Sequence, residues 1–429
     1  MHKITKLQSG LRLITIPLKE TQAVTVLVLV KVGSRYESLN LNGASHFIEH
    51  LMFKGTKKRP NTLALSQELD SVGAEFNAFT SKDHTGYYIK LDSSHLELAI
   101  DMLSDMLQNS KFDAQEINRE KGAITEEINM YEDNPLLLAP AFLEEVMFGK
   151  NNFLGQLIIG SKENIKKITR SHLLKFRDQF YNPSNMVIAI CGNFKQDGAV
   201  KLIKKYFNIN GQWPAPSRVE GSTVNCQPHT HKQTKPQIEI KYKKTEQAQL
   251  CLGYPAYSYT HPKIDALNIL NIILGANMSS RLFINVRERR GLCYFIKSDI
   301  NPYEDTGSFL IQAGLDKSRL SEAIKVIKKE ITNIKKDGVS PMELKKAKSY
   351  LQGKTILSLE ESSDLADWYA TQKILTNKIT TPEEKIKCVF KVSLADVKRV
   401  ANDIFKPEKT NLALIGDFHK QEKLLKLLL

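Results

Sequence analysis

Hydrophobic residues follow two different spacings along the chain. Near the N-terminus, ITIPLK and AVTVLVLVKVGS are rich in β-branched residues, and segment 75–91 has the pattern of paired strands. Elsewhere apolar residues recur every three or four positions, as in amphipathic helices. We expect such helices at about 42–54, 62–72, 93–109, 113–132 and 161–180. Strands and helices in blocks predict an α+β fold, a mostly antiparallel or mixed sheet with helices packed on one face.

The pattern occurs twice. Segments 180–194 and 404–418 align at a constant offset that places Pro183 on Pro407, and Thr169 and Ser393 open the preceding stretches as matching helix N-caps. A predicted buried helix stripe also repeats at this offset, with Ile100, Leu103 and Leu107 matching Ile324, Ile327 and Ile331. We therefore expect a duplicated module.

The two copies are separated by a segment dense in Pro, Gly, Ser and Thr. It has no apolar periodicity and is typical of a linker. We predict an N-terminal domain at 1–210, a linker at 211–237 and a homologous C-terminal domain at 238–429.

Composition narrows the class of protein. We expect no secretory signal, and no apolar run of the 429 residues approaches the 18 or so residues of a membrane span. The missing apolar run predicts a soluble protein with no membrane partner. The five cysteines are scattered, without a C-x-x-C pair, so we expect a cytoplasmic protein. The formal charge of +14 is the sole feature that favours a nucleic-acid partner, and a lysine-rich solvated surface is its commoner cause.

Chemically active residues gather at 46–50, where the chain reads His-Phe-Ile-Glu-His. Positions i, i+3 and i+4 share one face of a helix, so His46, Glu49 and His50 converge. This H-x-x-E-H pattern reverses the H-E-x-x-H of many zinc peptidases. It would arise by chance in on the order of one or two per hundred such sequences, so it indicates a zinc site without proving one.

A catalytic zinc site needs a third protein ligand. The predicted helix NREKGAITEEINMYED places Glu120 and Glu127 at i and i+7, on one face, whereas Glu126 is turned about 100° away and is the weaker candidate. On spacing alone, a solvated acidic face explains these residues equally well.

The GASHFIEHLMFKGT block, taken with the spacing from His50 to Glu127 and from Glu120 to Glu127, resembles the insulinase/pitrilysin family of zinc peptidases. The likeness covers essentially the whole chain, because that family is also built from two copies of one α+β module. It is closest to the short members, of the mitochondrial processing peptidase type and its bacterial relatives. The resemblance implies that His46, His50 and Glu127 bind one zinc ion, that Glu49 is the general base and that Glu120 supports the site.

The second copy lacks these ligands. Leu270, Ile273 and Leu274 stand at the positions of the motif, and Lys354 stands at that of Glu127, where the offset between the copies has drifted slightly. We therefore expect no zinc site in the C-terminal domain.

Two further residue pairs gain a role from the resemblance. On their own, Arg287 and Tyr294 are typical of a helix end and a core tyrosine. The resemblance implies instead that they hold the substrate carbonyl. In short-chain members these two residues would come from the partner subunit. Asn77 and Ala78 lie on a predicted edge strand, and the resemblance implies that an extended peptide pairs with it.

The resemblance thus implies a zinc-dependent endopeptidase that hydrolyses unfolded peptides or short extended segments in a closed chamber between clam-shell halves. Its partners would be the peptide substrate and a second subunit, in a homodimer or a heterodimer with a homologous chain. The alternative is a catalytically inactive structural or partner subunit of the same fold. Such subunits commonly lose part of the zinc triad, so the full set of residues favours the enzyme.

Overall fold

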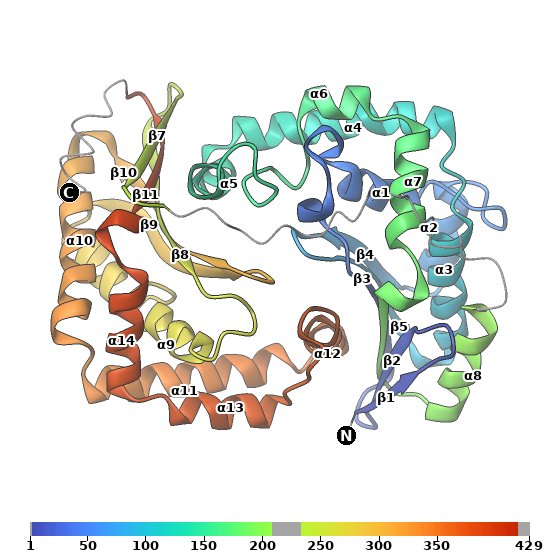
Figure 1. Cartoon of the computed structure of the whole chain (residues 1–429). Coiled ribbons are helices and arrows are strands. Elements are labelled where there is room, and N and C mark those ends of the chain that lie inside the picture. The colour runs from blue at the N-terminus through green and yellow to red at the C-terminus, as the bar shows by residue number, and fades with distance from the viewer. Residues whose placement is uncertain (1, 208–232, 419–429) are drawn as a thin grey trace. The chain divides into compact units, whose positions relative to one another are not determined.

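The computed structural model describes residues 2–207 and 233–418, which divide into two compact units. Among the described residues, unit 1 consists of 2–128, 157–207 and 357–380, and unit 2 of 129–156, 233–356 and 381–418. Each unit is built on one β-sheet with helices against it (Figure 1). The predicted α+β fold class is confirmed.

The sheet of unit 1 has six strands in the order β1-β2-β6-β3-β5-β4. β2 pairs with β6 in parallel, and all other neighbours are antiparallel. β4 is therefore an edge strand. The strands are β1 (Lys3–Lys6), β2 (Arg12–Pro17), β3 (Ala23–Val30), β4 (Glu75–Thr80), β5 (Thr85–Asp92) and β6 (Met186–Gly192).

Helices cover both faces of this sheet. α3 packs on β3 and β5, whereas α12 packs on β3 and β6 from the other face (Figure 1). Because both faces are covered, every residue of β3 after the first is buried, which explains its continuous apolar run. The helices that lie mainly in unit 1 are α1 (Ala44–Met52), α2 (Thr62–Asp70), α3 (Leu96–Asn109), α4 (Ala114–Asp133), α6 (Lys162–Lys167), α7 (Arg170–Phe180), α8 (Gln196–Tyr206) and α12 (Ser362–Thr376).

The sheet of unit 2 has five strands in the order β7-β11-β8-β10-β9, with β7 and β11 parallel. Its strands are β7 (Gln237–Tyr242), β8 (Gln247–Ala256), β9 (Cys293–Pro302), β10 (Gly307–Asp316) and β11 (Asn411–Gly416). Its helices are α5 (Pro135–Phe148), α9 (Ile264–Leu274), a π-helix (Phe283–Glu288), α10 (Leu320–Asp337), α11 (Pro341–Ser358), α13 (Pro382–Lys391) and α14 (Leu394–Ile404). Short 3-10 turns occur at Ser34–Tyr36, Leu39–Leu41, Ser93–His95, Pro183–Asn185, Lys317–Arg319 and Pro407–Lys409.

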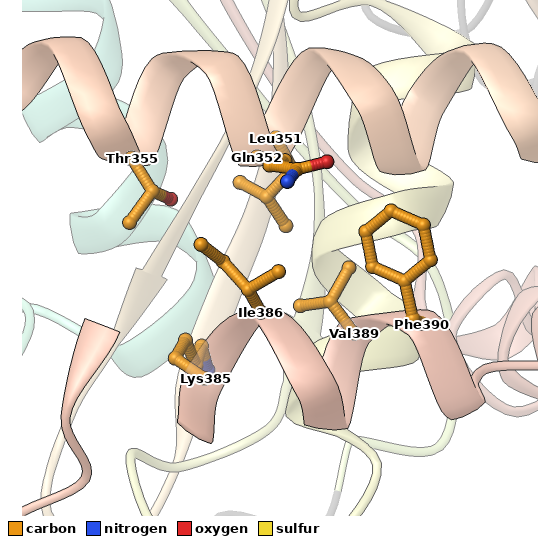
Figure 2. A pocket seen from close by; sticks show the side chains of 7 residues that line it. All are labelled: Leu351, Gln352, Thr355, Lys385, Ile386, Val389 and Phe390. Atoms are coloured by element: carbon orange, nitrogen blue, oxygen red, sulfur yellow. The ribbon is translucent and has the colours of Figure 1, made fainter. Parts of the chain in front are cut away.

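A narrow apolar cleft lies between α11 and α13 of unit 2. Ile386, Val389 and Phe390 of α13 point toward α11, where Leu351 and Thr355 line the opposite wall (Figure 2). The space between these side chains is too narrow to hold a water molecule. It therefore belongs to the packing of two helices within this unit.

The two units repeat one topology. β3, α7 and β5 of unit 1 recur at the predicted offset as β8, α14 and β10, which begin or end at the matching position. Strand order repeats as well, because β2-β6-β3-β5-β4 matches β7-β11-β8-β10-β9. Thr169 and Ser393 are the expected N-caps, and each forms a capping box with the third residue of its helix. The structure thus contains the predicted duplication.

Each unit includes one helix from the other half of the chain. α5 packs on β8 and β11 of unit 2, and α12 packs on β3 and β6 of unit 1. The offset that relates the start of α5 to the start of α12 also relates α4 to α11, so the two helices are counterparts in the duplication. The contiguous domains predicted at 1–210 and 238–429 therefore do not coincide with the compact units. The expectation of helices on one face is wrong for the same reason, since the exchanged helix covers the second face.

The predicted linker, 211–237, lies mostly outside the described residues. Within the described part, β7 begins at its last residue, Gln237. No helix among residues 2–207 and 233–418 combines the length and the apolar character needed to cross a membrane.

Candidate metal centre

Helix α1 buries one side and presents the other to solvent and to α4. Phe47, Ile48, Leu51 and Met52 are at most 1% exposed and anchor the helix in the core. His46, Glu49 and His50 lie on the remaining face, because positions i, i+3 and i+4 are neighbours on a helix. Core packing thus fixes the direction in which the motif points.

The N-terminus of α1 is held by a buried carboxylate. Gly43 precedes the helix with a φ of +100°, a conformation that favours glycine. Glu37 accepts hydrogen bonds from the backbone N–H of Gly43 at 2.7 Å and of Ser45 at 2.6 Å, and from the amide of Asn42 at 3.1 Å. Burial raises the pKa of Glu37 to about 7, although these hydrogen bonds lower it. Glu37 therefore acts as a remote cap for the motif helix.

Glu37→Ala is expected to lower the free energy of unfolding by about 3 kcal/mol, because two buried backbone N–H groups lose their side-chain acceptor. Chemical denaturation of the metal-free protein measures this loss. Glu20→Ala, at an exposed position of the same unit, is the control and should change stability little. A loss at position 37 no larger than that of the control would contradict the capping role.

Three potential ligand atoms meet between α1 and α4. Atoms of His46, His50 and Glu127 all lie within 4.8 Å of one another, the one such cluster among the described residues. Oε2 of Glu127 is 3.5 Å from Nε2 of His46 and 3.7 Å from Nε2 of His50. Two ligands of a tetrahedral zinc ion are about 3.4 Å apart when each is about 2.1 Å from the metal. The observed separations therefore fit this ion.

Glu120 fixes the ring of His50. Its Oε2 lies 2.9 Å from Nδ1 of His50, and its Oε1 lies 2.6 Å from Nζ of Lys54. Burial alone would raise the pKa of Glu120, but the hydrogen bonds from His50 and Lys54 lower it below its usual value. An ionised carboxylate can only accept, so Nδ1 of His50 donates and Nε2 keeps its lone pair for a metal.

Burial also tunes the other two ligands. Burial, helped by the nearby His50, lowers the pKa of His46 to about 3, so this ring is neutral at physiological pH. Nδ1 of His46 is buried without a hydrogen-bond partner among the described residues. Burial raises the pKa of Glu127, partly offset by His50. Two imidazoles and one carboxylate form the donor set of a catalytic zinc site.

Glu49 lies beside the ligands and is held by the edge strand. Its Oε2 accepts a hydrogen bond from Oγ1 of Thr80 at 2.6 Å, at the end of β4. Burial raises the pKa of Glu49, and the Thr80 hydrogen bond offsets part of the rise. A carboxylate with a raised pKa is suited to accepting and returning a proton near neutral pH.

The predicted peptide-binding residues lie on β4. Ala78 is buried, Asn77 is exposed, and the edge position expected from the sequence is confirmed. The backbone N–H of Ala78 donates to Oδ1 of Asn77 at 2.9 Å. This amide of the edge strand is thus covered by a neighbouring side chain. The binding role of both residues stays a prediction.

Unit 2 has apolar residues at the positions of the motif. Leu270, Ile273 and Leu274 of α9 are at most 3% exposed and belong to its core, and Lys354 is exposed on α11. The described residues of this unit contain no cluster of metal-ligating side chains. The second module therefore kept the packing role of the helix.

Arg287 and Tyr294 lie together in unit 2. The Arg287 guanidinium is 4.7 Å from the ring centroid of Phe283 and 5.7 Å from that of Tyr294. Tyr294 is 74% exposed, so the interpretation of a core tyrosine is wrong. Arg287 belongs to a π-helix, a rare element that occurs often at functional sites. Their substrate role stays a prediction.

Glu37 and Thr80 were not identified from the sequence. Glu37 lies between two short turns, Ser34–Tyr36 and Leu39–Leu41, and no periodicity connects it to α1. Thr80 shares a strand face with Phe76 and Ala78, but only the packing of β4 on α1 brings it to Glu49. Both residues can therefore be identified only from the tertiary packing of the folded chain.

Comparison with known proteins agrees with this geometry. Residues 12–160 match the family model "Insulinase (Peptidase family M16)", and residues 167–351 match "Peptidase M16 inactive domain". An uncharacterized zinc protease of Bacillus subtilis is 35% identical, over 95% of this chain and 97% of its own length. Another, from Streptomyces coelicolor, is 34% identical over 96% of this chain and 89% of its own.

Solved structures share the fold. A protease from Helicobacter pylori matches with a TM-score of 0.89 at 25% identity, covering 97% of this chain and 99% of that one. A structure titled as the peptidase M16 inactive domain from Pseudomonas fluorescens matches with a TM-score of 0.87 at 20% identity, covering 98% and 99%. The chain belongs to the insulinase family of zinc proteases, peptidase family M16.

Proposed function

We propose that this chain is a zinc-dependent endopeptidase that hydrolyses unfolded peptides or short extended segments. The observation that carries the proposal is the convergence of His46, His50 and Glu127 within 4.8 Å, with Glu49 on the same face of α1. One zinc ion per chain would be held by these three residues. When bound, it supplies a Lewis acid that polarises a peptide carbonyl and acidifies a water molecule.

The chain's own residues supply the proton transfers. Glu49 takes a proton on its carboxylate from the attacking water and returns it to the nitrogen of the leaving amine. Thr80, which donates to Oε2 of Glu49, keeps this carboxylate in one orientation. Glu120 holds the ring of His50 with Nε2 toward the ligand cluster.

The substrate would bind as an added strand on β4. β4 is an edge strand, and Thr80 at its end donates to Glu49, so a peptide added to this strand would lie near the proposed general base. An extended peptide that pairs with the strand would replace Oδ1 of Asn77 at the N–H of Ala78. Backbone pairing requires an unfolded segment, which is why we propose unfolded peptides as the substrate class.

Arg287 and Tyr294 are proposed to stabilise the oxyanion. These two residues would be supplied by a partner subunit of the same or a homologous chain. The half-buried cation of Arg287 and the exposed phenol of Tyr294 suit that role. We expect Arg287→Ala and Glu49→Gln each to be inactive alone. Mixed in equal amounts after subunit exchange, they should recover about a quarter of wild-type activity, because half of the dimers are mixed and each has one intact site. Absence of recovery, with exchange verified by differently tagged subunits, would contradict the shared site.

An inactive structural or partner subunit is the competing function. The match of residues 167–351 to a model described as inactive favours it for the second half of the chain. The test is zinc content and cleavage of a quenched peptide library by the purified protein, before and after chelation and zinc return. We expect one zinc per chain, and we expect cleavage to be lost on chelation and restored when zinc is returned. Bound zinc without any cleavage would favour the inactive subunit, and protein that binds no zinc would overturn the proposed site.

A further inference from the structure

Lys54 lies at the outer end of a chain of contacts that leads to the metal ligands. It lies two residues after the last residue of α1, and its backbone N–H donates to the carbonyl of Leu51 at 3.1 Å. Its Nζ is 2.6 Å from Oε1 of Glu120 on α4. The other oxygen of Glu120 is 2.9 Å from Nδ1 of His50. One carboxylate therefore joins a lysine and a metal-site histidine through separate oxygens.

Both ends of this chain are needed to hold the carboxylate. The Glu120 side chain is 8% exposed, so water supplies little of its solvation, whereas Lys54 is 26% exposed and keeps contact with solvent. A buried carboxylate that loses one of its two partners turns toward water or toward the remaining partner. Either movement changes the hydrogen bond that sets the orientation of His50.

We propose that Lys54 is a positioning residue for zinc: by holding Oε1 of Glu120, it keeps Oε2 on Nδ1 of His50 and the Nε2 of that ring directed at the ligand cluster. This inference rests on the proposed zinc site and extends it by one residue. The ammonium suits this position because it approaches a single oxygen as a compact charge. The hydrogen bond partners of a ligating histidine affect metal affinity by about 10- to 100-fold, so a residue that acts through such a partner should have an effect near the lower limit.

The test compares zinc dissociation constants, measured by competition with a chromophoric chelator. Lys54→Met keeps the length of the side chain without its charge and should weaken zinc binding by about tenfold. Lys54→Arg, which restores a cation, should recover most of the loss. Lys58→Met is the matched control, because Lys58 is an exposed lysine of the same loop. It pairs with Asp101 and not with Glu120. We expect its zinc affinity to equal that of the wild type.

A double mutant separates positioning from general stability. Glu120→Gln removes the carboxylate through which Lys54 acts, so adding Lys54→Met to it should weaken binding by less than about twofold more. Nitrogen chemical shifts of the metal-free protein should also show a smaller population of the Nδ1-protonated form of His50 in Lys54→Met. Unchanged zinc affinity in Lys54→Met, including the case in which only thermal stability falls, would overturn the inference. So would independent effects that multiply in the double mutant. Wild-type protein without zinc affinity would instead overturn the proposed function.

Discussion

Glu49→Gln is expected to lower kcat by about 10²- to 10⁴-fold while bound zinc stays at the wild-type level. The amide has nearly the shape of the carboxylate but cannot accept a proton from the attacking water. Glu49 is not part of the ligand cluster, which consists of His46, His50 and Glu127. The substitution therefore removes the proton acceptor and leaves the ligands in place.

Three measurements define the result: zinc per chain, kcat, and KM on one quenched peptide. We expect KM to change little, because the peptide would be bound by the backbone of β4. Glu126→Gln is the control, since Glu126 lies next to a proposed ligand but is exposed. Loss of zinc from Glu49→Gln would show that Glu49 is a ligand. Turnover within about tenfold of wild type would contradict its role as general base.

The chemistry of the site follows from local periodicity. The i, i+3, i+4 spacing of the motif needs only that 46–50 be helical, and α1 meets this condition. The same reasoning separates Glu127 from Glu126. α4 is helical across both, and the helical period directs Glu127 to the imidazoles and leaves Glu126 exposed.

The exchange of α5 and α12 could not be read from local patterns. The α5 sequence PLLLAPAFLEEVMF is apolar on nearly all sides and has Pro140 inside it, so it lacks the amphipathic pattern of a surface helix. It is helical because it is buried on a sheet whose strands come much later in the chain, β8 from Gln247 onward. Periodicity describes one element and its own faces. It cannot indicate which distant sheet an apolar helix covers.

The contacts that hold the site in place could not be predicted from periodicity either. Glu37 reaches α1 across the short turn Leu39–Leu41, and Glu120 meets Lys54 although the two lie on separate elements far apart in the sequence. Family resemblance could suggest Glu120, because its spacing from Glu127 is regular. Glu37, Thr80 and Lys54 have no such spacing, so their roles depend on how α1, β4 and α4 pack together.

His50→Ala is expected to weaken zinc binding by on the order of 10³-fold and to abolish turnover. Apparent zinc binding free energies of about 10–16 kcal/mol, divided over a four-ligand site, assign about 2.5–4 kcal/mol to each ligand. The substitution removes Nε2 from the cluster and also leaves Glu120 paired with Lys54 alone. Both changes act against the metal, so the effect should exceed that of Lys54→Met.

The fold should survive this substitution. The His50 side chain is 25% exposed, whereas α1 is anchored by Phe47, Ile48, Leu51 and Met52, which remain. In unit 2 the matching helix, α9, is stable with an apolar side chain at the equivalent position, Leu274. His50→Ala should therefore give a normal circular dichroism spectrum with no bound zinc, and the exposed control His95→Ala should keep both zinc and turnover. Full zinc occupancy in His50→Ala would place the metal elsewhere and contradict the proposed centre, because the two remaining side chains cannot hold a catalytic zinc ion tightly.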